Sequence, residues 1–137
     1  MRLLIDTNII LDVLQKREPH YKASSIIWKL CEVKKVEGCV STLTFANIMY
    51  ILRKELTSEQ IRETLKALSL IFDFTDLTPG ILQCAAELEM KDFEDAIQTA
   101  TAKKINADYI ISRNIKDFTA SDIAAYTPSE FLERFEM

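Results

Sequence analysis

The sequence predicts an α/β domain in which helices cover both faces of a mostly parallel sheet of four to five short strands. Short apolar runs of strand length alternate with longer segments whose apolar residues recur at helical spacing. Two helices often fall between successive strands, which is enough chain for crossovers between parallel strands. The 137 residues contain only 2 glycines and 3 prolines, so flexible linkers are not expected. We therefore expect one domain over residues 1–137.

The first strand is predicted at residues 2–6, where the apolar run RLLI meets an aspartate. Thr7 or Asn8 is expected to cap the helix that follows. A second helix is predicted over residues 21–35, where apolar residues form one face, and Gly38 is expected to end it.

The second strand is predicted at residues 39–42, a short apolar run. The helix expected after it covers residues 43–56 and takes Thr42 or Thr44 as its cap. The TSEQ sequence at residues 57–60 opens another helix, because a hydroxyl residue followed by glutamine is typical of a capping box.

The second half of the chain continues the alternation. Aromatic and β-branched residues at 71–77 predict a strand. Thr78 and Pro79 then suit the cap and first position of a helix that runs to about Met90. The remaining elements are a helix at 92–105, a strand at 108–112, a loop at 113–118, and a small strand before a helix that Pro128 begins.

Composition excludes several kinds of site. The net charge of −4 gives no general affinity for polyanions, so nucleic acid would need a local basic patch or a cation. Cys31, Cys39 and Cys84 are odd in number and form no CxxC pair, which argues against a thiolate zinc site and for a reducing compartment. The single histidine, His20, precedes a predicted helix and is interpreted as structural or solvated.

The start of the chain does not have the pattern of a secretory signal. Asp6, Asn8 and Asp12 interrupt its apolar run. No segment approaches the roughly 18 apolar residues of a membrane span. We therefore expect a cytoplasmic protein without membrane contact.

Several acids are predicted to meet at one edge of the sheet, because ligands of open parallel sheets bind at the carboxyl ends of the strands. Asp6 ends the first strand, where an unpaired buried charge would be costly. Asp117 lies in the loop after the strand at 108–112, together with Ser112 and Asn114.

Helices between parallel strands begin at this same edge. Asp92 and Asp95 open the helix at 92–105 and share one of its faces. Asn47 is expected in the first turn of the helix at 43–56. Each has an ordinary alternative: Asp92 as a helix cap with Glu94 and Asp95 complementing the dipole, and Asn47 as a capping partner of Thr44. Asp117 alone is also a common turn residue.

Converging carboxylates repel one another, and a divalent cation removes that repulsion. A site rich in oxygen and lacking histidine suits Mg²⁺ or Mn²⁺. Such an ion can polarise a phosphoryl oxygen or supply a nucleophilic water. Arg113 and Lys116 flank the site and are candidates for phosphate contacts. Asp12, near the same edge, is interpreted as solvated or as supporting the acids.

Four segments, in this order, resemble a PIN domain: LLIDTNIILD, STLTFANIMYIL, DFEDAIQTATA and ADYIISRNIKDF. The resemblance spans nearly the whole chain. It implies a three-layer α/β/α fold with a central parallel sheet and a ribonuclease site that uses Mg²⁺ or Mn²⁺. Many small bacterial members are VapC-like toxins of toxin–antitoxin pairs and are often dimeric, so RNA, an antitoxin protein and a second copy of the chain are the implied partners.

By position, Asp6, Asp95 and Asp117 match the family's catalytic, metal-binding acids. Asn47 stands where the family usually has a glutamate, which lowers the expected cation affinity, and Asp92 is the acid expected to supply the missing charge. Residues expected to support these acids or to contact substrate are Asn47, Asn114, Ser112, Thr7, Asn8, Arg113 and Lys116.

Three hypotheses follow. The first is a metal-dependent endoribonuclease that cleaves RNA phosphodiester bonds, acting as the toxin of a toxin–antitoxin pair. The alternative is a PIN-like module that binds RNA or protein and whose catalysis is weakened by Asn47. The third is a phosphohydrolase of another α/β family. The haloacid dehalogenase type requires a second aspartate two residues after the first, and Asn8 at that position argues against it.

Overall fold

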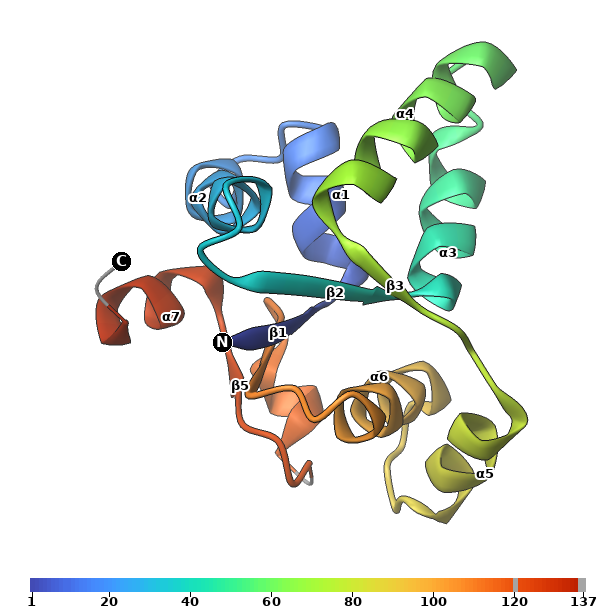
Figure 1. Cartoon of the computed structure of the whole chain (residues 1–137), viewed down its shortest axis with the longest axis vertical. Coiled ribbons are helices and arrows are strands. Elements are labelled where there is room, and N and C mark those ends of the chain that lie inside the picture. Colours follow the sequence, from blue (N-terminus) through green and yellow to red (C-terminus); the bar gives the residue numbers. More distant parts are fainter. Residues whose placement is uncertain (120, 136–137) are drawn as a thin grey trace.

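The computed structural model describes residues 1–119 and 121–135, and its centre is a five-stranded sheet (Figure 1). All neighbouring strands are parallel, in the order β3-β2-β1-β4-β5. The strands are β1 (Arg2–Ile5), β2 (Glu37–Ser41), β3 (Asp73–Thr75), β4 (Tyr109–Ile111) and β5 (Ala125–Tyr126). The predicted short parallel strands are therefore confirmed.

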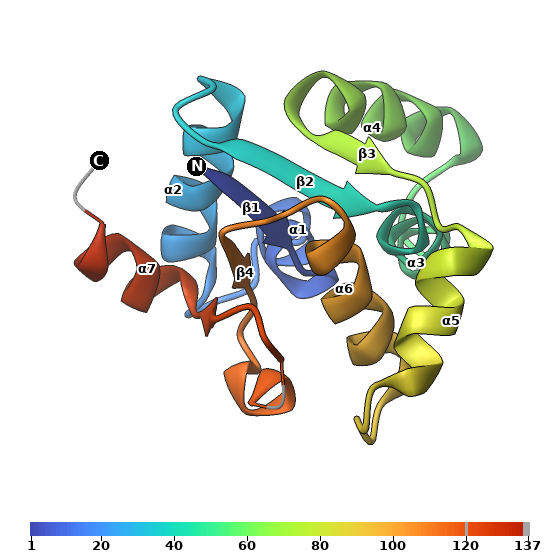
Figure 2. The ribbon, with the colours of Figure 1, turned by 60° about the horizontal axis from the view of Figure 1, so that its bottom comes forward.

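Helices cover both faces of the sheet, as the alternation of strands and helices predicted. Helices α1 to α4 lie on one side and α5 and α6 on the other, as Figures 1 and 2 show. The helices are α1 (Thr7–Leu14), α2 (Tyr21–Glu32), α3 (Thr42–Leu52), α4 (Ser58–Ile71), α5 (Pro79–Glu87), α6 (Phe93–Lys104), the 3₁₀ turn η1 (Ile115–Phe118) and α7 (Pro128–Arg134). This is the three-layer α/β/α arrangement.

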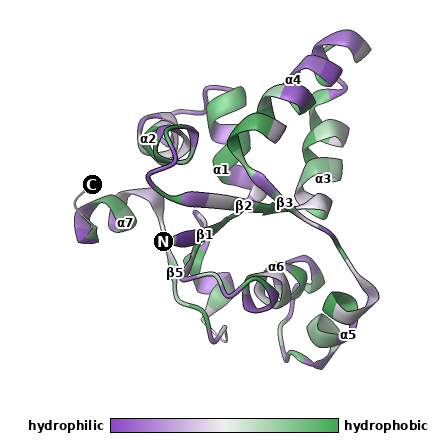
Figure 3. Ribbon diagram, in the orientation of Figure 1, coloured by the Kyte–Doolittle hydropathy of each residue, from purple (hydrophilic) through white to green (hydrophobic). Residues whose placement is uncertain are grey.

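Strand β1 occupies the middle of the sheet and is buried on both faces. Its side chains alternate, so Leu3 and Ile5 pack in the cluster formed with α1 to α4, whereas Leu4 packs with Ala102 and Ile110 on the α6 side. Leu3, Leu4 and Ile5 are fully buried, whereas the strand begins with the partly exposed Arg2. Figure 3 accordingly shows β1 as hydrophilic where it begins, beside the N-terminus.

Two helix caps differ from the prediction. Helix α1 begins at Thr7 and its cap is Asp6, whose carboxylate accepts a hydrogen bond from the Thr7 backbone N–H. Helix α3 begins at Thr42 and its cap is Ser41, not Thr42 or Thr44. In both cases the helix starts directly after the strand, so the residue at the junction takes the capping position.

Other helix ends were predicted more closely. The capping box of α4, between Thr57 and Gln60, and the Thr78 cap of α5 are confirmed. Helix α5 ends at Glu87 rather than near Met90, because Leu88 already has extended backbone geometry.

Gly38 does not end α2 as predicted. Helix α2 stops at Glu32 and the chain turns at Lys34, which has a left-handed φ of 63°. Gly38 lies within β2, where a Cβ atom would fall 2.5 Å from the Cys31 sulfur and 3.0 Å from Phe72 Cδ1. Glycine is required there by the close approach of α2 to the sheet.

Within residues 1–119 and 121–135, none of the helices combines the length and apolar character that crossing a bilayer demands.

We expect Gly38→Ala to lower the free energy of unfolding by about 1–3 kcal/mol, because the added methyl group overpacks the contact with Cys31 and Phe72. Gly80→Ala is the matched control, since its Cβ would meet nothing closer than 3.7 Å and should stabilise α5 by about 0.5–1 kcal/mol. Urea denaturation of both variants measures the difference. Equal midpoints for the two variants would contradict this account of Gly38.

Candidate active site

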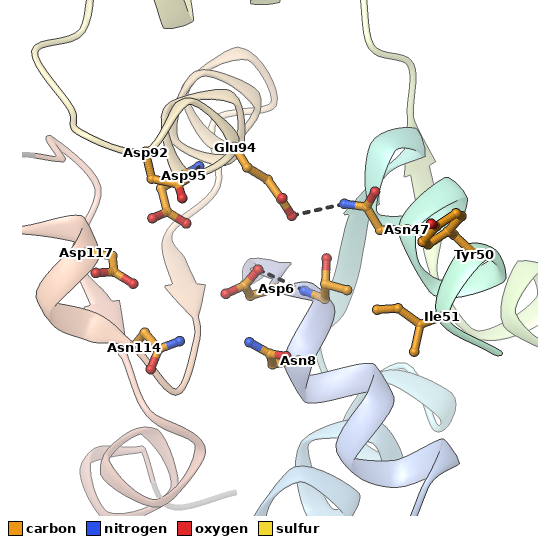
Figure 4. Close-up of a pocket in the computed structure, with 11 residues that line it drawn as sticks. Asp6, Asn8, Asn47, Tyr50, Ile51, Asp92, Glu94, Asp95, Asn114 and Asp117 are labelled. Atoms are coloured by element: carbon orange, nitrogen blue, oxygen red, sulfur yellow. Dashed lines mark hydrogen bonds between the residues drawn. The ribbon is translucent and has the colours of Figure 1, made fainter. Parts of the chain in front are cut away.

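An acidic pocket of about 340 Å³ opens at the carboxyl ends of the central strands (Figure 4). It lies beside the ends of β1 and β4 and the starts of α1 and α6. Its lining includes five carboxyl groups and, among the described residues, no lysine or arginine. The lining residues are Asp6, Thr7, Asn8, Asn47, Tyr50, Ile51, Asp92, Glu94, Asp95, Asn114 and Asp117.

Asp6 is held in place by donors from three segments. Its Oδ1 accepts from the Thr7 N–H at 2.8 Å and from Gln98 Nε2 at 3.4 Å, and its Oδ2 accepts from Ser112 Oγ at 2.8 Å. Burial raises the pKa of Asp6, the three hydrogen bonds oppose that rise, and the charge of Asp117 adds to it. The side chain is 9% exposed, so this carboxylate is a fixed part of the pocket floor.

Gln98 extends this network to α3. Its amide nitrogen also donates to Thr44 Oγ1 at 3.0 Å, and Thr7 Oγ1 lies 3.2 Å from the same oxygen. Gln98 and Thr44 are both buried. Gln98 was not predicted as a site residue, although its place three residues after Asp95 puts it near the same helix face.

The start of α6 contributes three acids. Asp92 caps the helix by accepting a hydrogen bond from the Asp95 N–H at 3.1 Å. It also lines the pocket, so the predicted helix cap and the predicted place at the pocket do not exclude each other. Burial, together with the charges of Asp92, Asp117, Asp6 and Glu94, raises the pKa of Asp95 to about 7. The carboxyl groups are therefore close enough to oppose one another's ionisation.

Asn47 lies in the second turn of α3, not the first, and it is not a capping partner of Thr44. Its Nδ2 donates to Glu94 Oε1 at 3.0 Å, as the dashed line in Figure 4 shows. Burial and the charges of Asp6 and Asp92 raise the pKa of Glu94, and the Asn47 bond opposes that rise. Glu94 was missed as a site residue, although its place between Asp92 and Asp95 in sequence was a usable signal.

The loop after β4 supplies the side of the pocket opposite α3 (Figure 4). Ser112 lies below the pocket against Asp6, and its Oγ accepts from the Asn114 N–H at 3.1 Å. Asn114 and Asp117 are exposed and line the pocket. Tyr50 and Ile51 of α3 line the other side and were not anticipated.

Arg113 and Lys116, the basic residues predicted to flank the site, lie in different surroundings. Arg113 does not line the pocket, because its Nε pairs with Asp12 at 3.1 Å. Asp12 is fully buried, so the interpretation of it as solvated is wrong. Lys116 lines an adjoining hollow that shares Asp92, Asp95 and Asp117 with the pocket, and Lys91 lines it too. His20 begins α2 and lies outside the acidic pocket.

Oxygen atoms dominate this pocket, which is the donor chemistry of Mg²⁺ and Mn²⁺ sites. Among residues 1–119 and 121–135, no three histidine, cysteine or acidic side chains already stand in a geometry that would hold a metal ion. Burial is the largest cause of the raised pKa values of Asp6, Glu94 and Asp95, and the charges of neighbouring acids add to it. A cation in the pocket would relieve that repulsion.

The fold and the pocket together define a doubly wound α/β protein with an acidic site at the carboxyl ends of its strands. Residues 2–116 match the family model described as the PIN domain. The chain therefore belongs to the PIN domain family, as its four sequence segments suggested.

Individual relatives agree with this assignment. The chain is 28% identical over 138 residues to the ribonuclease VapC1 of Aquifex aeolicus (strain VF5). The match covers 98% of this chain and 95% of that protein. A toxin–antitoxin complex from Klebsiella pneumoniae contains a chain that is 26% identical with a TM-score of 0.70, covering 92% of this chain and 97% of that one. VapBC2 from Rickettsia felis, bound to promoter DNA, is similar in fold, with 19% identity, a TM-score of 0.71 and coverage of 93% and 98%.

We expect Asp95→Asn to stabilise the metal-free protein at pH 8 and to have little effect at pH 4. Because the pKa of Asp95 in the folded protein is about 7, above its ordinary value, the stability that its protonated form contributes is complete below about pH 4 and is lost as the pH rises to 7. The variant stays neutral and escapes this loss. The gain should not exceed about 1 kcal/mol, because solvent screens this half-buried group.

Urea denaturation in chelator at both pH values measures the difference. Asp76→Asn, which removes an exposed acid outside the pocket, is the control. An equal effect of Asp95→Asn at pH 4 and pH 8 would argue against repulsion within the pocket.

Proposed function

We propose that this protein is a metal-dependent endoribonuclease that hydrolyses RNA phosphodiester bonds and serves as the toxin of a toxin–antitoxin pair. The observation that carries the proposal is the meeting of five carboxyl groups in one pocket at the carboxyl edge of a PIN fold. The similarity to a ribonuclease along almost the entire chain supports it.

Mg²⁺ or Mn²⁺ is the proposed cofactor, held by Asp6, Asp95 and Asp117 with Asp92 beside them. Their oxygen donors fit either ion. When bound, the cation would activate water and offset the charge of the phosphate. The chain itself keeps Asp6 fixed through Thr7, Ser112 and Gln98, so one ligand is preorganised.

Asn8 and Asn114 are proposed to orient the RNA backbone. Both side chains line the pocket, and an amide N–H₂ can donate to a phosphate oxygen without adding charge near the carboxylates. Neither residue makes a side-chain hydrogen bond to another described residue that would occupy this group.

Glu94 favours an enzyme over the catalytically weakened binding module. Asn47 removes a charge from α3, but its amide group holds the carboxylate of Glu94 at the pocket instead. The pocket therefore retains an acid next to α3. We propose that Glu94 compensates for the asparagine.

The proposed partners other than RNA are an antitoxin protein and a second copy of this chain. The Klebsiella pneumoniae relative is a toxin–antitoxin complex and the Rickettsia felis relative is a VapBC assembly, which supports an antitoxin partner. The proposed location is the cytoplasm, where the free thiols of this chain and its RNA substrate would both be found.

Calorimetry should detect Mn²⁺ binding to the wild-type protein, and Asp6→Asn and Asp95→Asn should each weaken that binding at least tenfold, because each removes a charged ligand. Glu94→Gln should weaken it by less. RNA cleavage with Mn²⁺ should fall at least a hundredfold in the Asp6 and Asp95 variants.

The exposed Asp76→Asn variant controls for nonspecific loss of charge and should behave as wild type. Failure of the wild-type protein to bind Mn²⁺, with or without RNA, would refute the metal-dependent mechanism. Retained RNA binding in chelator without any cleavage would support the binding module instead.

We expect Lys91→Gln/Lys116→Gln to weaken the binding of a short single-stranded RNA and to reduce the slope of log K against log salt by about 1.4. The two lysines line the hollow that adjoins the acidic pocket, and among the described residues neither forms an ion pair. Fluorescence anisotropy between 50 and 200 mM salt, approximate limits that span physiological ionic strength, measures the slope.

Both proteins should carry Asp95→Asn to suppress cleavage during that measurement. The matched control is Lys22→Gln/Lys35→Gln, which removes two exposed lysines outside the pocket and the hollow. An equal change of slope in both pairs would show that these lysines act only through net charge.

A further inference from the structure

A charged side chain is fully buried outside the acidic pocket. Asp12, in the second turn of α1, is 0% exposed. Ser24 of α2 donates to its Oδ2 at 3.1 Å, and Arg113 Nε lies 3.1 Å from the same oxygen. Its Oδ1 has no hydrogen-bond partner among the described residues. Arg113 is thus the cation that compensates this charge.

Arg113 lies at the start of the loop that carries part of the candidate site. Its neighbour Ser112 donates to Asp6, and its other neighbour Asn114 lines the pocket. The Asn114 carbonyl in turn accepts from the Asp117 N–H at 3.0 Å. The position of Asn114 and Asp117 therefore depends on how this short stretch is anchored.

Among the described residues, two polar side-chain contacts join this loop to the segment of β1 and α1. They are the Ser112 bond to Asp6 and the Arg113 pair with Asp12. At the far end of the loop, Phe118 is buried in the apolar cluster with Leu4. Asn114 and Asp117 are themselves exposed, so they rely on these anchors.

We propose that the buried Asp12–Arg113 ion pair positions the loop that presents Asn114 and Asp117 to the acidic pocket. Arg113 is then a positioning residue that acts through the backbone of its neighbours, and it is not the phosphate contact that the sequence suggested. The consequence for catalysis rests on the proposed nuclease function, whereas the anchoring of the loop does not.

A buried ion pair is a poor device for stability alone. Apolar replacement of both partners is often neutral or stabilising, whereas removal of one partner leaves a buried charge uncompensated. The pair instead fixes the position of the loop, because the Arg113 side chain extends from the loop to Asp12 on α1. Asp6 caps α1, so the same rigid element fixes one acid and anchors the loop that carries another.

Arg113→Met and the double variant Asp12→Asn/Arg113→Met separate positioning from stability. Arg113→Met should lower Tm by about 10 °C, because it leaves Asp12 buried and unpaired. The double variant should recover most of that loss. Both variants should nevertheless bind Mn²⁺ roughly tenfold more weakly and exchange the amide hydrogens of residues 114–117 at least about tenfold faster.

Arg113→Lys is expected to restore part of the Mn²⁺ affinity, because it returns a cation to Asp12. Glu32→Gln is the matched control, since it breaks the exposed Lys29–Glu32 pair and should change neither quantity. A double variant with wild-type Mn²⁺ affinity and wild-type amide exchange would overturn the proposal, since the pair would then contribute stability alone.

The two proposals fail in different ways. If the wild-type protein binds no Mn²⁺ and cleaves no RNA, the proposed function is wrong. Amide exchange in the double variant still decides whether the ion pair anchors the loop, because that measurement requires neither metal nor substrate.

Discussion

The carboxylate of Asp6 is the constraint around which the candidate site is arranged. It ends the central strand, caps α1 and accepts hydrogen bonds from Thr7, Gln98 and Ser112. A buried anion is tolerated only where donors compensate its lost hydration, and here those donors come from segments far apart in the chain. The packing of α6 and β4 against β1 and the shape of the pocket therefore depend on one another.

Electrostatic balance explains the rest of the pocket. Five acids line the pocket, and burial together with the charges of neighbouring acids raises the pKa of Asp6, Glu94 and Asp95. None of the described lysines or arginines lines the pocket to offset this cost in the metal-free protein. Proteins tolerate such strain at sites whose ligand relieves it. Asn47 of α3 carries no charge and donates to Glu94 of α6, so the acid beside α3 belongs to a different helix.

The sequence was sufficient to place the acids because topology alone brings them together. The apolar run before Asp6, the start of α6 and the loop after β4 all meet at the carboxyl edge of a parallel sheet, whatever the exact packing. Packing, in contrast, determines the contacts that Gln98, Glu94 and Arg113 make. The spacing from Asp92 and Asp95 marks Gln98 and Glu94 as candidates, but a polar residue on a helix has the same local pattern whether it is solvated or faces a buried carboxylate, so the sequence does not show which contacts they make. The caps at Asp6 and Ser41 were missed because no loop separates strand from helix there.

The order of the strands has a consequence for protein synthesis. Strand β1 is made first, yet one of its two neighbours, β4, and the Ser112 donor of Asp6 lie about a hundred residues further along the chain, with Ser112 106 positions after Asp6. A ribosome-bound or prematurely terminated chain that stops before β4 lacks Ser112, Asn114 and Asp117 and leaves an edge of the central strand unpaired. The pocket is completed only after β4 and the loop that follows it have been translated. An activity located there would therefore be absent from the unfinished chain.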